Sequence, residues 1–141
     1  MTSPMTGSLT SIRGIAEIVL NVRDQAASLR FYRDVFGLAV ISPLDRPGPI
    51  FLQVGPGSPL GAGIPQMIVL VPLPAGAAEF TRPRTLHHLA LEVAPEDFDG
   101  VEAYLRGLGY STRGGKHPVI PSRTLYVDDP DGNEVEIICR A

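Results

Sequence analysis

The chain is poor in the features that mark secreted, membrane-spanning or nucleic-acid-binding proteins. It has a single cysteine, Cys139, so no internal disulfide can form, and this favours a reducing, cytoplasmic setting. No apolar run approaches the roughly 20 residues that a membrane-spanning helix needs. The first residues also lack the charged and apolar regions of a secretory signal. Lys and Arg total 12 and are scattered, so we expect no electropositive surface for nucleic acids.

The remaining composition is typical of a soluble globular protein. The chain has 141 residues, of which 44% are apolar and 19% charged, and its net charge is −3. A chain of this length forms one domain or two small modules and buries roughly two-thirds of its unfolded surface. The 15 glycines and 14 prolines indicate many loops and few long helices. We interpret the polar, aperiodic residues 1–12 as a mobile tail.

Residues 13–83 are predicted to form one βαβββ module that ends in a linker. Asp24 suits the N-cap of a helix that runs to Phe36, and Gly37 stands where a left-handed C-cap is expected. The apolar and β-branched runs predict strands on either side of this helix. These strands are expected at residues 15–22, 38–41, 50–54 and 66–71. Residues 55–65 are expected to form a flexible loop and residues 72–83 the linker.

Residues 84–141 repeat the same order of elements. A helix is expected to begin at Pro95, with acidic residues in its first turn, and to end at Gly109. Strands are expected at residues 86–93, 110–113, 124–127 and 134–139. The strand that begins at Glu17 aligns with the one that begins at His88, 71 positions later (88 − 17). The helix-ending glycines are 72 positions apart (109 − 37), so the two halves stay in register. The predicted fold class is α+β, with two βαβββ modules whose mixed sheets curl around a cleft.

The last predicted strand carries an unusual charge. Asp129-Pro130-Asp131-Gly132-Asn133 predicts a tight polar turn, because proline presets φ and glycine allows a positive φ. Glu136 follows in the strand, between Val135 and Ile137. One interpretation is the solvent face of an edge strand. The other is a metal ligand or general base that points into a cavity lined by the sheet.

The repeat makes Glu17 and His88 equivalent, and it pairs Val69 with Glu136 in the final strands of the two halves. Two modules related by a pseudo-twofold axis would bring these positions together. An imidazole and carboxylates on rigid strands suit a divalent transition metal with open coordination positions. We therefore predict a metal site at Glu17, His88 and Glu136. Each residue alone is more readily explained by a structural or surface role, so the prediction rests on the repeat.

The chain resembles the vicinal oxygen chelate superfamily, which includes glyoxalase I, extradiol dioxygenases, methylmalonyl-CoA epimerase and the fosfomycin- and bleomycin-resistance proteins. The resemblance covers residues 13–140. It rests on three segments, which read EIVLNVRDQAASLRFYRDVFGLAV, HHLALEV and YVDDPDGNEVEI. It implies the paired βαβββ fold, a divalent metal such as Fe, Mn, Zn or Ni, a small-molecule substrate and a homodimer.

The resemblance implies that Glu17, His88 and Glu136 occupy metal-ligand positions. Glu17 departs from the family, since the dioxygenases, the epimerase and bacterial glyoxalases have histidine there. Val69 falls where glyoxalase I has a catalytic glutamate, and valine cannot abstract a proton, which argues against glyoxalase chemistry. By resemblance to the extradiol dioxygenases, His117 would handle protons and Tyr126 would hydrogen-bond a metal-bound substrate oxygen. Two carboxylate ligands would neutralise a divalent cation and weaken its pull on a substrate oxyanion.

Three functions remain open at this stage. The first is a metal-dependent enzyme, dioxygenase-like, that acts on a small oxygenated substrate. The second is a metal-free protein that sequesters a drug or metabolite, as bleomycin-resistance proteins do, and the absence of tryptophan weakens it mildly. The third is a structural or regulatory protein without a ligand. His88 and Glu136 favour the first function and Glu17 favours the second.

Overall fold

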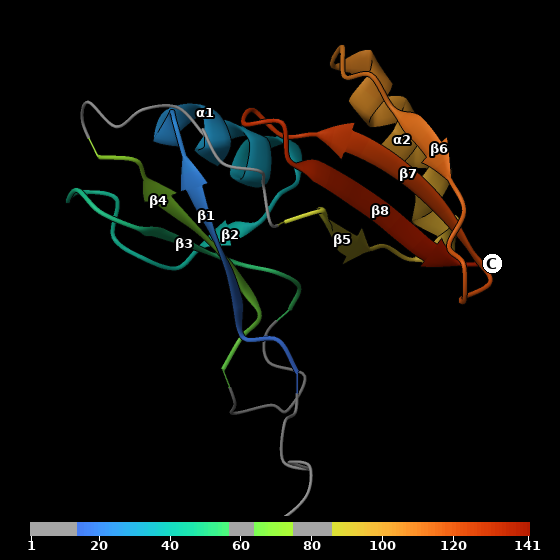
Figure 1. The fold of residues 1–141 in the computed structure, drawn as a ribbon, viewed down its shortest axis with the longest axis horizontal. Helices are drawn as coiled ribbons and strands as arrows, with labels where there is room; N and C mark the ends of the chain where they lie inside the picture. Colours follow the sequence, from blue (N-terminus) through green and yellow to red (C-terminus); the bar gives the residue numbers. More distant parts are fainter. Residues whose placement is uncertain (1–13, 57–63, 75–85) are drawn as a thin grey trace, which may run out of the picture.

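The computed structural model describes residues 14–56, 64–74 and 86–141, and within these ranges it contains two four-stranded mixed sheets, each accompanied by a helix (Figure 1). The predicted α+β fold with two βαβββ halves is therefore confirmed, although the two sheets are not closed. The expected tail 1–12, most of the loop 55–65 and most of the linker 72–83 lie outside the described residues.

The first sheet has the strand order β1-β4-β3-β2, in which β1 and β4 are parallel and the other neighbours are antiparallel. The parallel pair requires a crossover, and the helical segment between β1 and β2 is part of it. The strands of this sheet are β1 (Glu17–Val22), β2 (Ala39–Val40), β3 (Ile50–Gln53) and β4 (Met67–Pro72).

The first helical segment starts and stops where the sequence predicts. The Asp24 carboxylate accepts a hydrogen bond from the backbone N–H of Ala27 at 3.1 Å, which caps α1 (Gln25–Leu29). Gly37 ends the segment with φ at 73°, a conformation that costs other residues energy. The second part of the predicted helix is instead a π-helix, η1 (Arg30–Val35). This wider winding is not visible in an apolar periodicity.

The second sheet repeats the first, with the order β5-β8-β7-β6 and a parallel β5–β8 pair. The strand predicted at residues 110–113 lies later in the chain, at β6, because its hydrogen bonds come from pairing with β7. The elements of this half are β5 (His88–Glu92), η2 (Pro95–Asp97), α2 (Phe98–Gly107), β6 (Arg113–Gly115), β7 (Ser122–Asp128) and β8 (Glu134–Arg140).

The strand registers place equivalent residues of the two halves at equivalent points. Glu17 opposes Met67 in the first parallel pair, and His88 opposes Glu134 in the second. Two residues further along these strands, Val69 opposes Val19 in the first sheet, and Glu136 opposes Ala90 in the second. The sequence repeat is thus a structural repeat, in which Glu17 corresponds to His88 and Val69 to Glu136.

The two halves share one apolar core and a polar junction. Buried side chains from both halves form a single cluster, and the Phe31 and Tyr110 rings meet edge to face across it at 5.7 Å. At the polar junction, the Tyr32 hydroxyl donates to the buried Asp129 carboxylate at 2.7 Å. The Arg23 side chain donates to Asp131 at 3.0 Å. The turn between β7 and β8 is therefore held by the first helical segment, and this fixes the start of β8.

Among the described residues, no helix is both long enough and apolar enough to cross a membrane.

Candidate functional site

The candidate site lies on one face of the second sheet. Side chains alternate between the two faces of a strand, and paired residues on neighbouring strands point to the same face. Glu136 pairs with Ala90 on β5 and with Tyr126 on β7, and His88 is two residues before Ala90. Three of the five predicted site residues, His88, Tyr126 and Glu136, therefore share this face. The opposite face carries the apolar residues that pack in the core, such as Val135 and Ile137.

Glu136 is a buried carboxylate on β8. Its side chain is 4% exposed, and its Oε1 atom lies 3.1 Å from Nε2 of His88. Its Oε2 atom has no hydrogen-bond partner within the described part of the chain. A buried carboxylate oxygen without a partner is costly, and such groups are usually satisfied by a donor or a cation. The pair His88–Glu136 thus offers the nitrogen and oxygen donors that a divalent transition metal binds.

Tyr126 lies beside this pair, with its ring centroid 5.8 Å from that of His88. Burial raises the pKa of the Tyr126 phenol, and the negative charge of Glu136 raises it further. The phenol therefore stays protonated at neutral pH and can donate a hydrogen bond. Gly115 on β6 makes room for this ring, because a Cβ atom there would overlap the Tyr126 side chain and lie 2.8 Å from Thr124 Oγ1.

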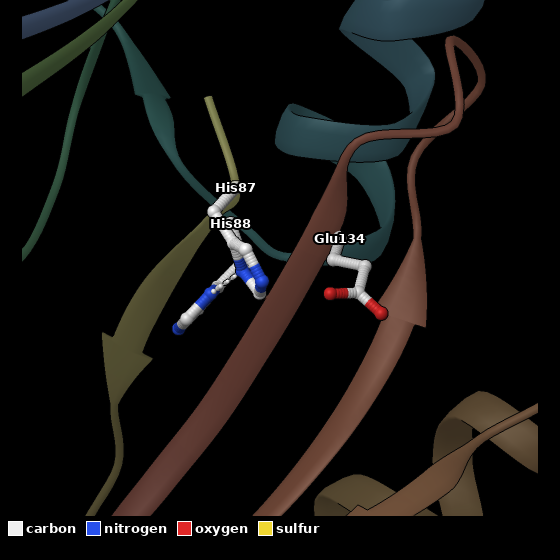
Figure 2. Close-up of side chains that lie close together, drawn as sticks. All are labelled: His87, His88 and Glu134. Carbon is white, nitrogen blue, oxygen red and sulfur yellow. Dashed lines mark hydrogen bonds between the residues drawn. The ribbon is translucent and has the colours of Figure 1, made fainter. Parts of the chain in front are cut away.

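A second group of side chains lies at the start of β5 and β8 (Figure 2). The Nδ1 atoms of His87 and His88 are 2.7 Å apart, and the ligand atoms of His87, His88 and Glu134 all lie within 4.8 Å of one another. The Glu134 carboxylate also accepts from Arg113 at 3.1 Å, and the same guanidinium nitrogen donates to Asp128 at 2.8 Å. His87 and Glu134 are not among the site residues predicted from the sequence. The sequence spacing could have indicated Glu134, because it is two residues before Glu136 and therefore points to the same face of β8.

The other two predicted site residues are not members of these described clusters. Glu17 is exposed at the start of β1, and the described side chains that could share a metal with His88 within 4.8 Å do not include it. His117 lies in the loop between β6 and β7, where its Nδ1 atom accepts from the backbone N–H groups of Val119 at 3.1 Å and Ile120 at 2.9 Å. These bonds hold the imidazole in the loop and leave Nε2 as the nitrogen for other partners.

Comparison with known proteins identifies the family. The model of the Glyoxalase/Bleomycin resistance protein/Dioxygenase superfamily matches residues 14–137. Biphenyl-2,3-diol 1,2-dioxygenase of Paraburkholderia xenovorans (strain LB400) is 33% identical over 137 residues, which cover 94% of this chain and 43% of the relative. The chain thus spans less than half the length of the curated relatives it matches.

Solved structures show the same fold. A glyoxalase/dioxygenase from Nostoc punctiforme superposes with a TM-score of 0.71 at 22% identity and covers 99% of both chains. A fosfomycin resistance protein from Listeria monocytogenes has a TM-score of 0.66 at 20% identity and covers 92% of this chain and 95% of its own. Together with the family match, these likenesses confirm the resemblance seen in the sequence. The chain belongs to the glyoxalase/bleomycin resistance protein/dioxygenase superfamily.

Proposed function

We propose that this chain is a metal-dependent vicinal oxygen chelate enzyme, dioxygenase-like, that acts on a small substrate with two neighbouring oxygen atoms. The observation that carries the proposal is the buried Glu136 carboxylate, which has one oxygen 3.1 Å from His88 Nε2 and the other without a partner among the described residues. We propose His88 and Glu136 as ligands of a divalent cation, because an imidazole nitrogen and a carboxylate oxygen suit such an ion. Glu17 does not join His88 in a described cluster of donor atoms within 4.8 Å, so its role as the third ligand is proposed from the family resemblance alone. When bound, such a cation holds the two substrate oxygens and stabilises negative charge that develops on them.

The remaining residues act on the substrate. The Tyr126 phenol has a raised pKa, so at neutral pH it keeps its proton and can donate a hydrogen bond to a substrate oxygen. The absence of a side chain at Gly115 leaves the space that the Tyr126 ring occupies. His117, whose Nδ1 accepts from the loop backbone, presents Nε2 for the proton transfers of the reaction. The substrate class is that of the ortho-dihydroxy aromatic compounds, in keeping with the dioxygenase relatives.

The test is oxygen consumption by the Fe²⁺-reconstituted protein with biphenyl-2,3-diol. We expect uptake that depends on the diol, and a fall of about a hundredfold or more in kcat for Tyr126→Phe, because a positioned proton donor contributes 10²–10⁴-fold. Tyr104→Phe is the matched control, since Tyr104 is an exposed tyrosine on α2 and should leave kcat unchanged. Equal rates in the two variants would remove Tyr126 from the mechanism. No uptake by the iron-loaded wild type would overturn the dioxygenase proposal.

A metal-free binding protein is the second candidate. It is favoured by Glu17, a carboxylate where the resemblance to dioxygenases, the epimerase and bacterial glyoxalases implies histidine, and which is not part of the described donor cluster. In that case Glu17 and Glu136 would provide negative charge for a cationic ligand. The two proposals differ in one observable property, because only the enzyme retains a metal.

A further inference from the structure

We infer that His87, His88 and Glu134 form a second cation site, at the solvent side of the proposed metal centre, which takes Zn²⁺ or Ni²⁺. The donors are two imidazole nitrogens and one carboxylate, and they come from the start of β5 and the start of β8 (Figure 2). Two nitrogens and one oxygen suit a borderline ion such as zinc or nickel and disfavour Mg²⁺ or Ca²⁺. All three side chains reach solvent, so an ion can enter and leave.

The geometry of the histidine pair supports this site. The two Nδ1 atoms face each other at 2.7 Å and share a hydrogen bond, so both nitrogens already point to the place where a cation would replace the proton. Zinc–nitrogen bonds of about 2.0–2.1 Å in a tetrahedral site place two nitrogens about 3.3 Å apart. The two nitrogens therefore need to separate by about 0.6 Å (3.3 − 2.7), which the exposed His87 allows.

Glu136 takes a different role toward this second site. His88 Nε2 lies 3.1 Å from Glu136 Oε1 while His88 Nδ1 faces His87. With a cation on Nδ1, Nε2 carries the proton and donates to Glu136, the carboxylate–histidine–metal arrangement that orients a ligand and raises its basicity. With a cation on Nε2, as in the proposed enzyme, Nδ1 carries the proton instead. A neutral imidazole cannot bind both ions, so the second site competes with the catalytic centre. This competition rests on the proposed function, whereas the second site itself does not.

Arg113 opposes the second site. Its guanidinium group donates to Glu134 at 3.1 Å, so a cation must share or displace this ion pair. Asp128 lies 2.8 Å from the same nitrogen and can hold Arg113 when Glu134 turns to the cation. Loss of the arginine should therefore tighten cation binding. If the cluster had a purely structural role, loss of Arg113 would not tighten cation binding while loss of His87 weakens it.

The test is calorimetric titration with ZnCl₂ in the Glu136→Gln background. Glutamine still accepts from His88 Nε2–H but removes a ligand of the proposed centre, so the second site is measured alone. We expect zinc to bind to this variant, to bind about tenfold or more weakly when His87→Ala is added, and to bind more tightly when Arg113→Gln is added. His117→Ala is the matched control for this titration, because His117 is a loop histidine outside the cluster and its loss should leave zinc binding unchanged.

Two results would overturn the second site. One is a Glu136→Gln protein that takes up no zinc. The other is zinc binding that His87→Ala and His117→Ala weaken equally. Neither result bears on the proposed enzymatic function. That proposal would fail separately, if the wild-type protein did not bind Mn²⁺. MgCl₂ titrated in place of ZnCl₂ should give no binding to the second site, because its donors are mainly nitrogen.

Discussion

Asp129→Ala is expected to lower the free energy of unfolding by about 3–5 kcal/mol, the usual cost of removing one partner from a buried charged network. The Asp129 carboxylate accepts from the Tyr32 hydroxyl, from the backbone N–H groups of Asp131 and Asn133, and from the Asn133 side chain, at 2.7–2.9 Å. Its removal leaves the buried Tyr32 hydroxyl unpaired and frees the turn that begins β8. Equilibrium denaturation in urea, followed by circular dichroism, measures the loss.

The matched control is Asp128→Ala, one residue earlier. Asp128 is 52% exposed and pairs with Arg113 at the surface, so its loss should cost no more than about 1 kcal/mol. Tyr32→Phe provides a milder test if Asp129→Ala fails to fold. It removes one of the donors to Asp129 and should cost about 1–3 kcal/mol. If Asp128→Ala and Asp129→Ala lose the same stability, the turn does not join the two halves as described.

Glu136→Gln is expected to stabilise the metal-free protein and to abolish its stabilisation by metal. In the metal-free protein, the buried Glu136 carboxylate has an oxygen without a partner among the described residues. Neutralising it should therefore raise the free energy of unfolding by about 1 kcal/mol. Mn²⁺ at about a hundred times its dissociation constant should stabilise the wild type by about 2.7 kcal/mol. The variant should show no such gain.

Mn²⁺ is the suitable probe because it prefers carboxylate oxygen and binds weakly to nitrogen-rich donor sets such as the second site. The control is Glu92→Gln, the same chemical change at an exposed position of β5, and it should respond to Mn²⁺ as the wild type does. Thermal unfolding with and without the ion measures both effects. A Glu136→Gln protein that is less stable without metal, yet still stabilised by Mn²⁺, would show that Glu136 has a structural role.

Local patterns predicted much of the fold because the signals were local. Asp24 and Gly37 mark helix ends through their own backbone and side-chain chemistry, and the structure has the helix cap and the positive φ there. The alignment of Glu17 with His88 predicted the structural repeat, since the repeat preserves strand register. The π-helical winding of Arg30–Val35 was not predictable from an apolar periodicity.

The parts that were not predicted depend on distant residues. Asp129 was interpreted only as a turn residue, but its Tyr32 partner is 97 positions away in the sequence. The strand β6 begins at Arg113 rather than ending there, because pairing with β7 decides its position. The same distinction applies to the candidate site. Strand register brings His88, Tyr126 and Glu136 to one face of the second sheet. The positions of His117 and Glu17 depend instead on the conformation of a loop and on the arrangement of the two sheets, and their roles stay predictions.

The central claim is a metal centre at His88 and Glu136, and metal content tests it most directly. The chain is purified without chelators, passed through gel filtration and measured by elemental analysis, as wild type, Glu136→Gln and His87→Ala. The account predicts near-stoichiometric Fe, Mn, Zn or Ni in the wild type and in His87→Ala, because the exposed second site releases its ion during filtration. Glu136→Gln should retain almost none. Equal metal in all three proteins, or none in the wild type even after reconstitution, would contradict the claim.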